Sequence, residues 1–142
     1  MNLNSELLRP LIAQVLLTAC VWAALLTARL VSMIRNRVGM EELKGAAGYS
    51  KIADTDAISD NFENQFEVPV LFYLMLVLLL VSGKSEPGLV TAAWIFVGSR
   101  AVHSLIHCTF NSVYARFSAY LTGCLALAWM GWRTWGLLLS AS

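Results

Sequence analysis

The sequence predicts an all-α fold, a bundle of four transmembrane helices that run antiparallel to one another. Of its 142 residues, 58% are hydrophobic and only 13% are charged, whereas soluble domains average roughly 45–50% apolar and about 25% charged residues. A chain of this length folded in water has too little interior to bury so much apolar surface. The formal net charge is +1 and the basic residues are scattered, which argues against nucleic-acid binding. The three cysteines lie in apolar runs without paired spacing, and this pattern predicts neither a disulfide framework nor a cysteine-rich metal site.

Four apolar segments supply the helices, since about 20 helical residues cross the ~30 Å of hydrocarbon in a bilayer. The first segment is uncharged over residues 10–28, and Pro10 suits a first helical turn. The second is uncharged over residues 68–83, the third contains Arg100 as its one formal charge, and the fourth is uncharged over residues 117–132. We therefore expect a single membrane domain over residues 1–142, with helices at about 9–36, 58–83, 87–112 and 114–139 and a polar loop at about 37–57.

The distribution of basic residues predicts the orientation of these helices. Positive charge favours the cytoplasmic side of a membrane. A larger group of basic residues lies beside the first and third connections and consists of Arg35, Arg37, Lys44, Lys51 and Arg116. A smaller group lies at the opposite ends of the helices and consists of Arg9, Lys84 and Arg133. We expect both termini outside and the long loop in the cytoplasm.

Polar residues inside the expected spans are the first candidates for a site, because charges in hydrocarbon cost several kcal/mol unless they are paired or hydrated. The helical rise places Arg100 about 10 Å from the cytoplasmic boundary and Glu67 about 9 Å from the same boundary. Their matching depth and opposite charge predict an ion pair. A buried pair of this kind also has a purely structural interpretation, in which it fixes the register of the helices.

Each expected helix adds polar residues to one layer near the cytoplasmic side. Those of the second and third helices recur at helical spacing and therefore share a face; they are Asp60, Glu63, Asn64 and Glu67, and Arg100, His103, His107 and Asn111. Arg116 and Tyr120 are i, i+4 neighbours on the fourth helix, and Arg35 lies at the end of the first. The histidines also suit interhelical hydrogen bonds, and Arg116 alone would suit an interfacial anchor.

In this layer the sequence resembles the MAPEG family of membrane proteins in eicosanoid and glutathione metabolism, as a bacterial-type member. The resemblance depends on the order and spacing of four motifs along the whole chain. They are Arg35-Asn-Arg37, Asn64-Gln-Phe-Glu67 followed by Pro69, Arg100-Ala-Val-His103, and Arg116 with Tyr120.

The resemblance implies a homotrimer with active sites between neighbouring subunits on the cytoplasmic side. Glutathione would be the cofactor, and Arg116, with Tyr120, would be catalytic by stabilising its thiolate. The residues that would bind glutathione or form the floor of its site are Arg35, Asn64, Glu67, Arg100, His103 and His107. The implied function is a membrane glutathione-dependent transferase or peroxidase that acts on lipophilic electrophiles or lipid hydroperoxides. The expected partners are further copies of the chain, membrane lipid and a lipophilic small-molecule substrate.

Two other functions remain open at this point. Asp60 and Glu63 occupy positions at which glutathione-binding members of the family often have arginines, which favours a non-catalytic membrane protein of this fold that binds lipid or another ligand. Alternatively, Glu63 and Glu67 on one helix and His103 and His107 on the next could hold zinc or iron. The sequence contains no P-loop, dinucleotide fingerprint or nucleophile elbow that indicates another class of enzyme.

Overall fold

The computed structural model describes residues 3–44 and 46–139, and every regular element in these ranges is helical. The long helices are α1 (Leu3–Asn36), α3 (Asp56–Glu63), α4 (Val68–Ser82), α5 (Pro87–Cys108) and α6 (Val113–Leu139). The short elements are η1 (Met40–Leu43), α2 (Ala46–Tyr49), η2 (Ser50–Thr55) and η3 (Asn64–Phe66). The all-α prediction is confirmed.

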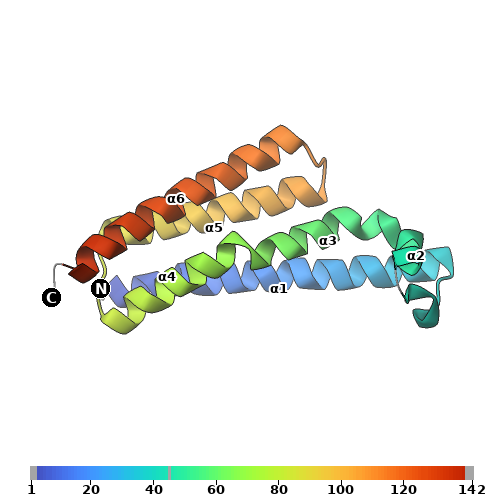
Figure 1. Ribbon diagram of the computed structural model, residues 1–142, viewed down its shortest axis with the longest axis horizontal. Coiled ribbons are helices and arrows are strands. Elements are labelled where there is room, and N and C mark those ends of the chain that lie inside the picture. Colours follow the sequence, from blue (N-terminus) through green and yellow to red (C-terminus); the bar gives the residue numbers. More distant parts are fainter. Residues whose placement is uncertain (1–2, 45, 140–142) are drawn as a thin grey trace.

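The long helices run antiparallel in chain order, with α3 and α4 together forming the second member of the bundle (Figure 1). The beginning of α1, the α4–α5 connection and the end of α6 lie at one end, and α2 lies at the other. The most extensive helix pairing joins α5 to α6, and α1 packs against α3, α4 and α5. The bundle thus consists of an α5–α6 hairpin beside α1 and the α3–α4 pair.

Within the described ranges, three segments are long and apolar enough to cross a membrane, namely Ser5–Asn36, Ala47–Ser82 and Pro87–Cys108. The fourth helix, α6, has 27 residues, but Arg116, Arg133 and several tryptophans and glycines lower its mean hydropathy. Large apolar side chains point outward from all four members of the bundle, such as Leu16, Leu74, Leu105 and Leu125. Such an outer surface suits lipid, because hydrocarbon solvates these side chains and water does not.

The second predicted helix, 58–83, differs from the structure because it is interrupted. It begins at Asp56, tightens into η3, and leaves helical geometry at Glu67, where φ is −93° and ψ is −106°. Pro69 explains the break, since proline has no N–H to donate and its ring collides with the carbonyl four residues earlier. The interruption separates the polar α3 from the apolar α4.

Other boundaries also differ from the expected ones. Helix α1 begins at Leu3 instead of residue 9. The fully buried Leu7 continues the apolar stripe of the helix toward the N-terminus, on the other side of Pro10. Helix α5 ends at Cys108 instead of 112, and Asn111 has a left-handed backbone with φ of 47°. Asparagine tolerates this conformation better than most residues. The turn therefore ends α5 and directs the chain into α6.

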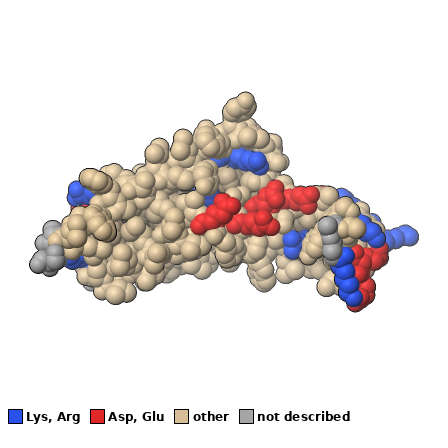
Figure 2. All heavy atoms as spheres, viewed as in Figure 1, with Lys and Arg blue, Asp and Glu red and all other residues tan. Residues whose placement is uncertain are grey.

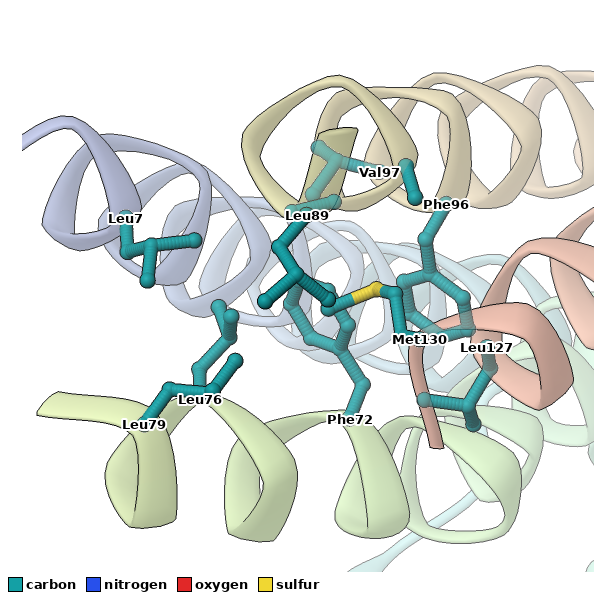
Figure 3. Packing of buried hydrophobic residues seen from close by; sticks show 11 residues of the cluster. Leu7, Phe72, Leu76, Leu79, Leu89, Phe96, Val97, Leu127 and Met130 are labelled. Carbon is teal, nitrogen blue, oxygen red and sulfur yellow. The ribbon is translucent and has the colours of Figure 1, made fainter. Parts of the chain in front are cut away.

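The hydrophobic core packs between α1, α4, α5 and α6 (Figure 3). Phe72 from α4 and Phe96 from α5 are fully buried and stack with ring centroids 4.3 Å apart and planes 12° apart. Around them pack Leu7, Leu76, Leu79, Leu89, Leu127 and Met130. Where α5 meets α6, a Cβ on Gly123 would lie 2.5 Å from the Ser99 Oγ. This glycine permits the close approach of the two helices.

A buried polar cross-link joins α1, η3 and α5. The Gln14 Nε2 donates to the Gln65 Oε1 at 3.2 Å, and the Gln65 Nε2 donates to the Ser104 Oγ at 3.1 Å. All three side chains are at most 5% exposed. Because an unpaired amide costs several kcal/mol in hydrocarbon, this chain of bonds favours one placement of η3 against α5.

The first connection is attached to the end of α1. The Asp54 carboxylate accepts from the Ser32 Oγ and from an Arg35 Nη, each at 2.5 Å. The Asn36 Nδ2 donates to the Lys51 carbonyl at 3.0 Å, and Lys51 pairs with Glu42. These bonds hold the connection against the end of α1.

At the opposite end, a bidentate ion pair joins the α4–α5 connection to α6. The Arg133 Nε and Nη2 each donate to a Glu86 carboxylate oxygen at 2.7 Å. This hydrogen bonding lowers the pKa of Glu86 below its ordinary value of 4.5.

The pKa of Glu86 predicts a pH dependence of stability. A carboxylate with a lowered pKa in the folded state contributes stability above its unfolded pKa and loses that contribution as pH falls through the folded pKa. Wild type should therefore have a higher thermal midpoint than Glu86→Gln near pH 7, and the difference should shrink as pH falls below about 4.3 and disappear once pH is below the lowered folded pKa of Glu86. The measurement is thermal unfolding in detergent across this range; a difference independent of pH would contradict the assignment.

Candidate functional site

A pocket of about 300 Å³ opens between α3, α5 and α6. It gathers most of the polar residues that the sequence analysis assigned to one layer. Its lining consists of Asp60, Asn64, His103, His107, Val113, Arg116, Phe117 and Tyr120. The predicted site residues Asn64, His103, His107, Arg116 and Tyr120 are therefore neighbours in space.

Arg116 lies one turn into α6, and two neutral groups accept hydrogen bonds from it. Its Nη1 donates to the His107 Nε2 at 3.1 Å and to the Asn111 Oδ1 at 2.8 Å. Among the described side chains, no carboxylate forms an ion pair with Arg116. No described carboxylate therefore neutralises the positive charge that the guanidinium presents at the pocket wall.

His103 connects α5 to the first turn of α6. Its Nδ1 donates to the Arg116 carbonyl oxygen at 2.9 Å. Its other ring nitrogen, Nε2, is buried and makes no hydrogen bond within the described chain. The ring also lies 6.0 Å from that of Tyr120, between centroids. His103 therefore fixes the backbone at Arg116 and leaves one polar atom for a ligand or water.

Arg100 lies deeper, and its side chain is 1% exposed. Its Nη2 donates to the Asn64 carbonyl oxygen at 3.1 Å, and its Cζ lies 5.7 Å from the centroid of the Tyr120 ring. Its Nε and Nη1 have no partner in the described part of the chain. Arg100 thus supports two lining residues from beneath the pocket.

The predicted ion pair between Arg100 and Glu67 is wrong for the single chain. Glu67 is exposed, and no ion pair between described residues joins it to Arg100. The depth estimate assumed a continuous helix, whereas the backbone departs from helical geometry at Glu67 itself. Arg100 contacts the backbone of η3 in place of a carboxylate.

Arg35 is another predicted site residue that the single chain does not bring to the pocket. It pairs with Asp54 in the first connection. Two residues of the predicted polar layer that were not assigned a contact with glutathione also reach the site. Asp60 lines the pocket, and Asn111 contacts Arg116 from the α5–α6 turn. The helical pattern placed Asn111 on the face of a continuing helix, and only the left-handed turn at this residue brings its amide to Arg116.

The glutamate–histidine metal site does not assemble in the described part of the chain. Glu63 and Glu67 are exposed, whereas His103 and His107 are buried. No group of three or more histidine, cysteine, aspartate or glutamate side chains in the described ranges has the geometry to hold a metal ion. The break after η3 accounts for this, since it removes the shared helical face on which the alternative depended.

The electrostatic surroundings of the pocket are mixed. Acidic side chains gather on the face over α3 and the residues that follow it (Figure 2). The exposed acidic residues of this segment are Asp56, Asp60, Glu63 and Glu67. Arg116 supplies positive charge from α6, and Arg100 supplies it from below. The pocket therefore has a cationic inner wall and an acidic rim.

The geometry of these helices and motifs agrees with a comparison against protein families. A model described as "MAPEG family" matches residues 7–136, which is nearly the whole chain. Neither a search of curated proteins nor a search of solved structures returns a match. The apolar helices and this match together show an integral membrane protein. The chain belongs to the MAPEG family, the membrane proteins of glutathione and eicosanoid metabolism.

Proposed function

We propose that this protein is a glutathione-dependent transferase or peroxidase that acts on lipophilic electrophiles or lipid hydroperoxides within the membrane. The observation that carries the proposal is the guanidinium of Arg116 at the pocket wall, where both described groups that accept its hydrogen bonds are neutral. A free cysteine thiol has a pKa of about 8.5 and is mostly protonated at neutral pH. A neighbouring positive charge favours the thiolate, which is the nucleophilic form.

The residues of the pocket fit a glutathione thiol and its peptide. Arg116 faces the pocket beside the aromatic ring of Tyr120. The buried nitrogens of His103 and Arg100 that have no partner in the described chain offer further polar contacts nearby. Bound glutathione would supply the reducing and nucleophilic sulfur. Arg116 would hold the thiolate, and the Tyr120 hydroxyl would donate a hydrogen bond to it. The apolar outer surface would admit lipophilic substrates from the bilayer, where low polarity strengthens these electrostatic effects.

We further propose a homotrimer whose sites are completed by a neighbouring subunit. Support comes from Arg35 and Glu67, which match family motifs but lie outside the pocket of their own chain. Both are exposed, so either could contribute to the pocket of another copy. The larger group of basic residues lies at the end that holds the first connection, which supports the orientation with this loop and the site in the cytoplasm and the termini outside.

The acidic rim favours a second candidate, a non-catalytic protein of the same fold that binds lipid or another ligand. Asp60 lines the pocket, and glutathione carries a net charge of about −1 at neutral pH, so the two repel each other. The position of the Asp60 carboxylate in the pocket lining is the specific observation behind the second candidate.

Titration of glutathione into the purified protein in mild detergent separates the two candidates. We expect saturable binding, and we expect Asp60→Asn to bind about fivefold more tightly because roughly 1 kcal/mol of repulsion is removed. Asp56→Asn is the matched control, since Asp56 lies on the same helix but does not line the pocket. If neither wild type nor Asp60→Asn bound glutathione at millimolar concentration, the proposal would be abandoned in favour of the second candidate.

A further inference from the structure

We infer that His107 and Asn111 are positioning residues, which hold the Arg116 guanidinium in the pocket through neutral hydrogen-bond acceptors. The inference rests on the proposed function for its catalytic meaning, although the geometry can be tested without glutathione. It concerns Arg116 and two groups from the end of α5 and the following turn.

The hydrogen bond between Arg116 and His107 defines the protonation of the imidazole. A guanidinium donates hydrogen bonds and accepts none. The His107 Nε2, 3.1 Å from the Arg116 Nη1, must therefore be the acceptor. A neutral imidazole that accepts at Nε2 has its proton on Nδ1. His107 is 3% exposed, so the surrounding helices hold its ring in this orientation.

Asn111 reaches the same Nη1 from the other side because of its backbone. Its φ of 47° and the hydrogen bond from its N–H to the Ile106 carbonyl, at 2.8 Å, form the turn that ends α5. The side chain then accepts from the Arg116 Nη1 through its Oδ1 at 2.8 Å. The two acceptors lie before and after the end of α5, so a change in this turn would move the guanidinium.

The neutrality of both acceptors has a consequence for the charge at the pocket. A carboxylate in either position would orient the guanidinium and also cancel most of its field. An imidazole and an amide orient it and leave the full positive charge for an anionic ligand. Asp60, which lines the same pocket, forms no ion pair with Arg116. His107 therefore has a role through Arg116, without the need to touch the ligand.

Nitrogen-15 NMR of histidine-labelled protein tests the geometry directly. The chain has only 2 histidines, so the spectrum contains two imidazoles, and the His103→Gln variant assigns them. We expect the Nδ1-protonated form of His107 at neutral pH, and we expect Arg116→Leu to shift its Nε2 resonance. An Nε2-protonated His107, or a resonance unchanged in Arg116→Leu, would overturn the inference whether or not glutathione binds.

The functional consequence is read from the ultraviolet absorbance of the thiolate, expressed per molecule of bound glutathione. His107→Leu removes the acceptor, and we expect about a tenfold lower ratio of thiolate to thiol. His107→Gln offers an amide oxygen in its place and should restore most of that ratio. A merely structural role would lower the amount of bound glutathione without changing the thiolate fraction of what is bound.

The two readouts distinguish failure of the inference from failure of the proposed function. If the NMR result held and wild type bound no glutathione, only the proposed function would fall. If wild type bound glutathione as a thiolate and His107→Leu bound it with the same thiolate fraction, the inference would fall and the proposed function would stand. Val102→Ala, at an exposed position of α5, controls for a general effect of substitution in this helix.

Discussion

Replacing Arg116 with alanine is expected to lower kcat/KM for the proposed glutathione-dependent reaction by about 100-fold, or roughly 2.7 kcal/mol of transition-state stabilisation. The guanidinium is the one cationic group that lines the described pocket, and its acceptors leave its charge uncancelled. Its loss should raise the pKa of the bound thiol and reduce the nucleophile at neutral pH. The measurement is conjugation of a lipophilic electrophile or reduction of a lipid hydroperoxide by the purified protein.

The lysine variant shows which property of Arg116 matters. Arg116→Lys keeps the charge but loses the guanidinium Nη1 that donates to His107 and Asn111, so we expect an intermediate rate. Arg9→Ala is the matched control, because Arg9 is an exposed arginine at the other end of the bundle that pairs only with Glu6 among described carboxylates. An Arg116→Ala rate equal to that of wild type would remove Arg116 from the proposed mechanism.

The helices were largely predictable from the sequence because a bilayer requires an apolar helix of sufficient length for every span. Apolar length alone indicates α1, α4 and α5, since a hydrocarbon solvent requires continuous helices. The interruption at Glu67 was not predicted. The hydropathy of residues 58–83 does not show it, whereas the backbone chemistry of Pro69 does.

The pocket was predictable only in part, for a related reason. Residues at i, i+4 spacing on one helix stay neighbours in any packing, so the presence of Arg116 and Tyr120 in one pocket follows from the sequence. Contacts between elements depend on turns and breaks. The break at Glu67 turned Arg100 toward a backbone carbonyl, and the left-handed Asn111 placed an amide against Arg116. The proposed role of Arg35 would depend on a neighbouring copy, which the sequence of one chain does not describe.

Phe72→Ala should destabilise the folded bundle by about 2–4 kcal/mol. In a membrane the burial of the Phe72 side chain contributes no hydrophobic free energy, because lipid is as apolar as the core. The loss comes instead from packing, since Phe72 is fully buried and stacks on Phe96 at 4.3 Å. A cavity at this point removes dispersion contacts from α4 and α5 together. The measurement is reversible unfolding in mixed micelles.

A lipid-facing substitution supplies the control for this prediction. Leu74 is on the same helix as Phe72 and is 65% exposed, so lipid can fill the space that Leu74→Ala leaves. We expect Leu74→Ala to change the unfolding free energy by less than about 0.5 kcal/mol. A double-mutant cycle of Phe72→Ala with Phe96→Ala should give a coupling energy of about 1 kcal/mol, because both truncations remove the same stacked contact. Equal effects at Leu74 and Phe72 would mean that the stability of the bundle does not depend on the stacked contact between α4 and α5.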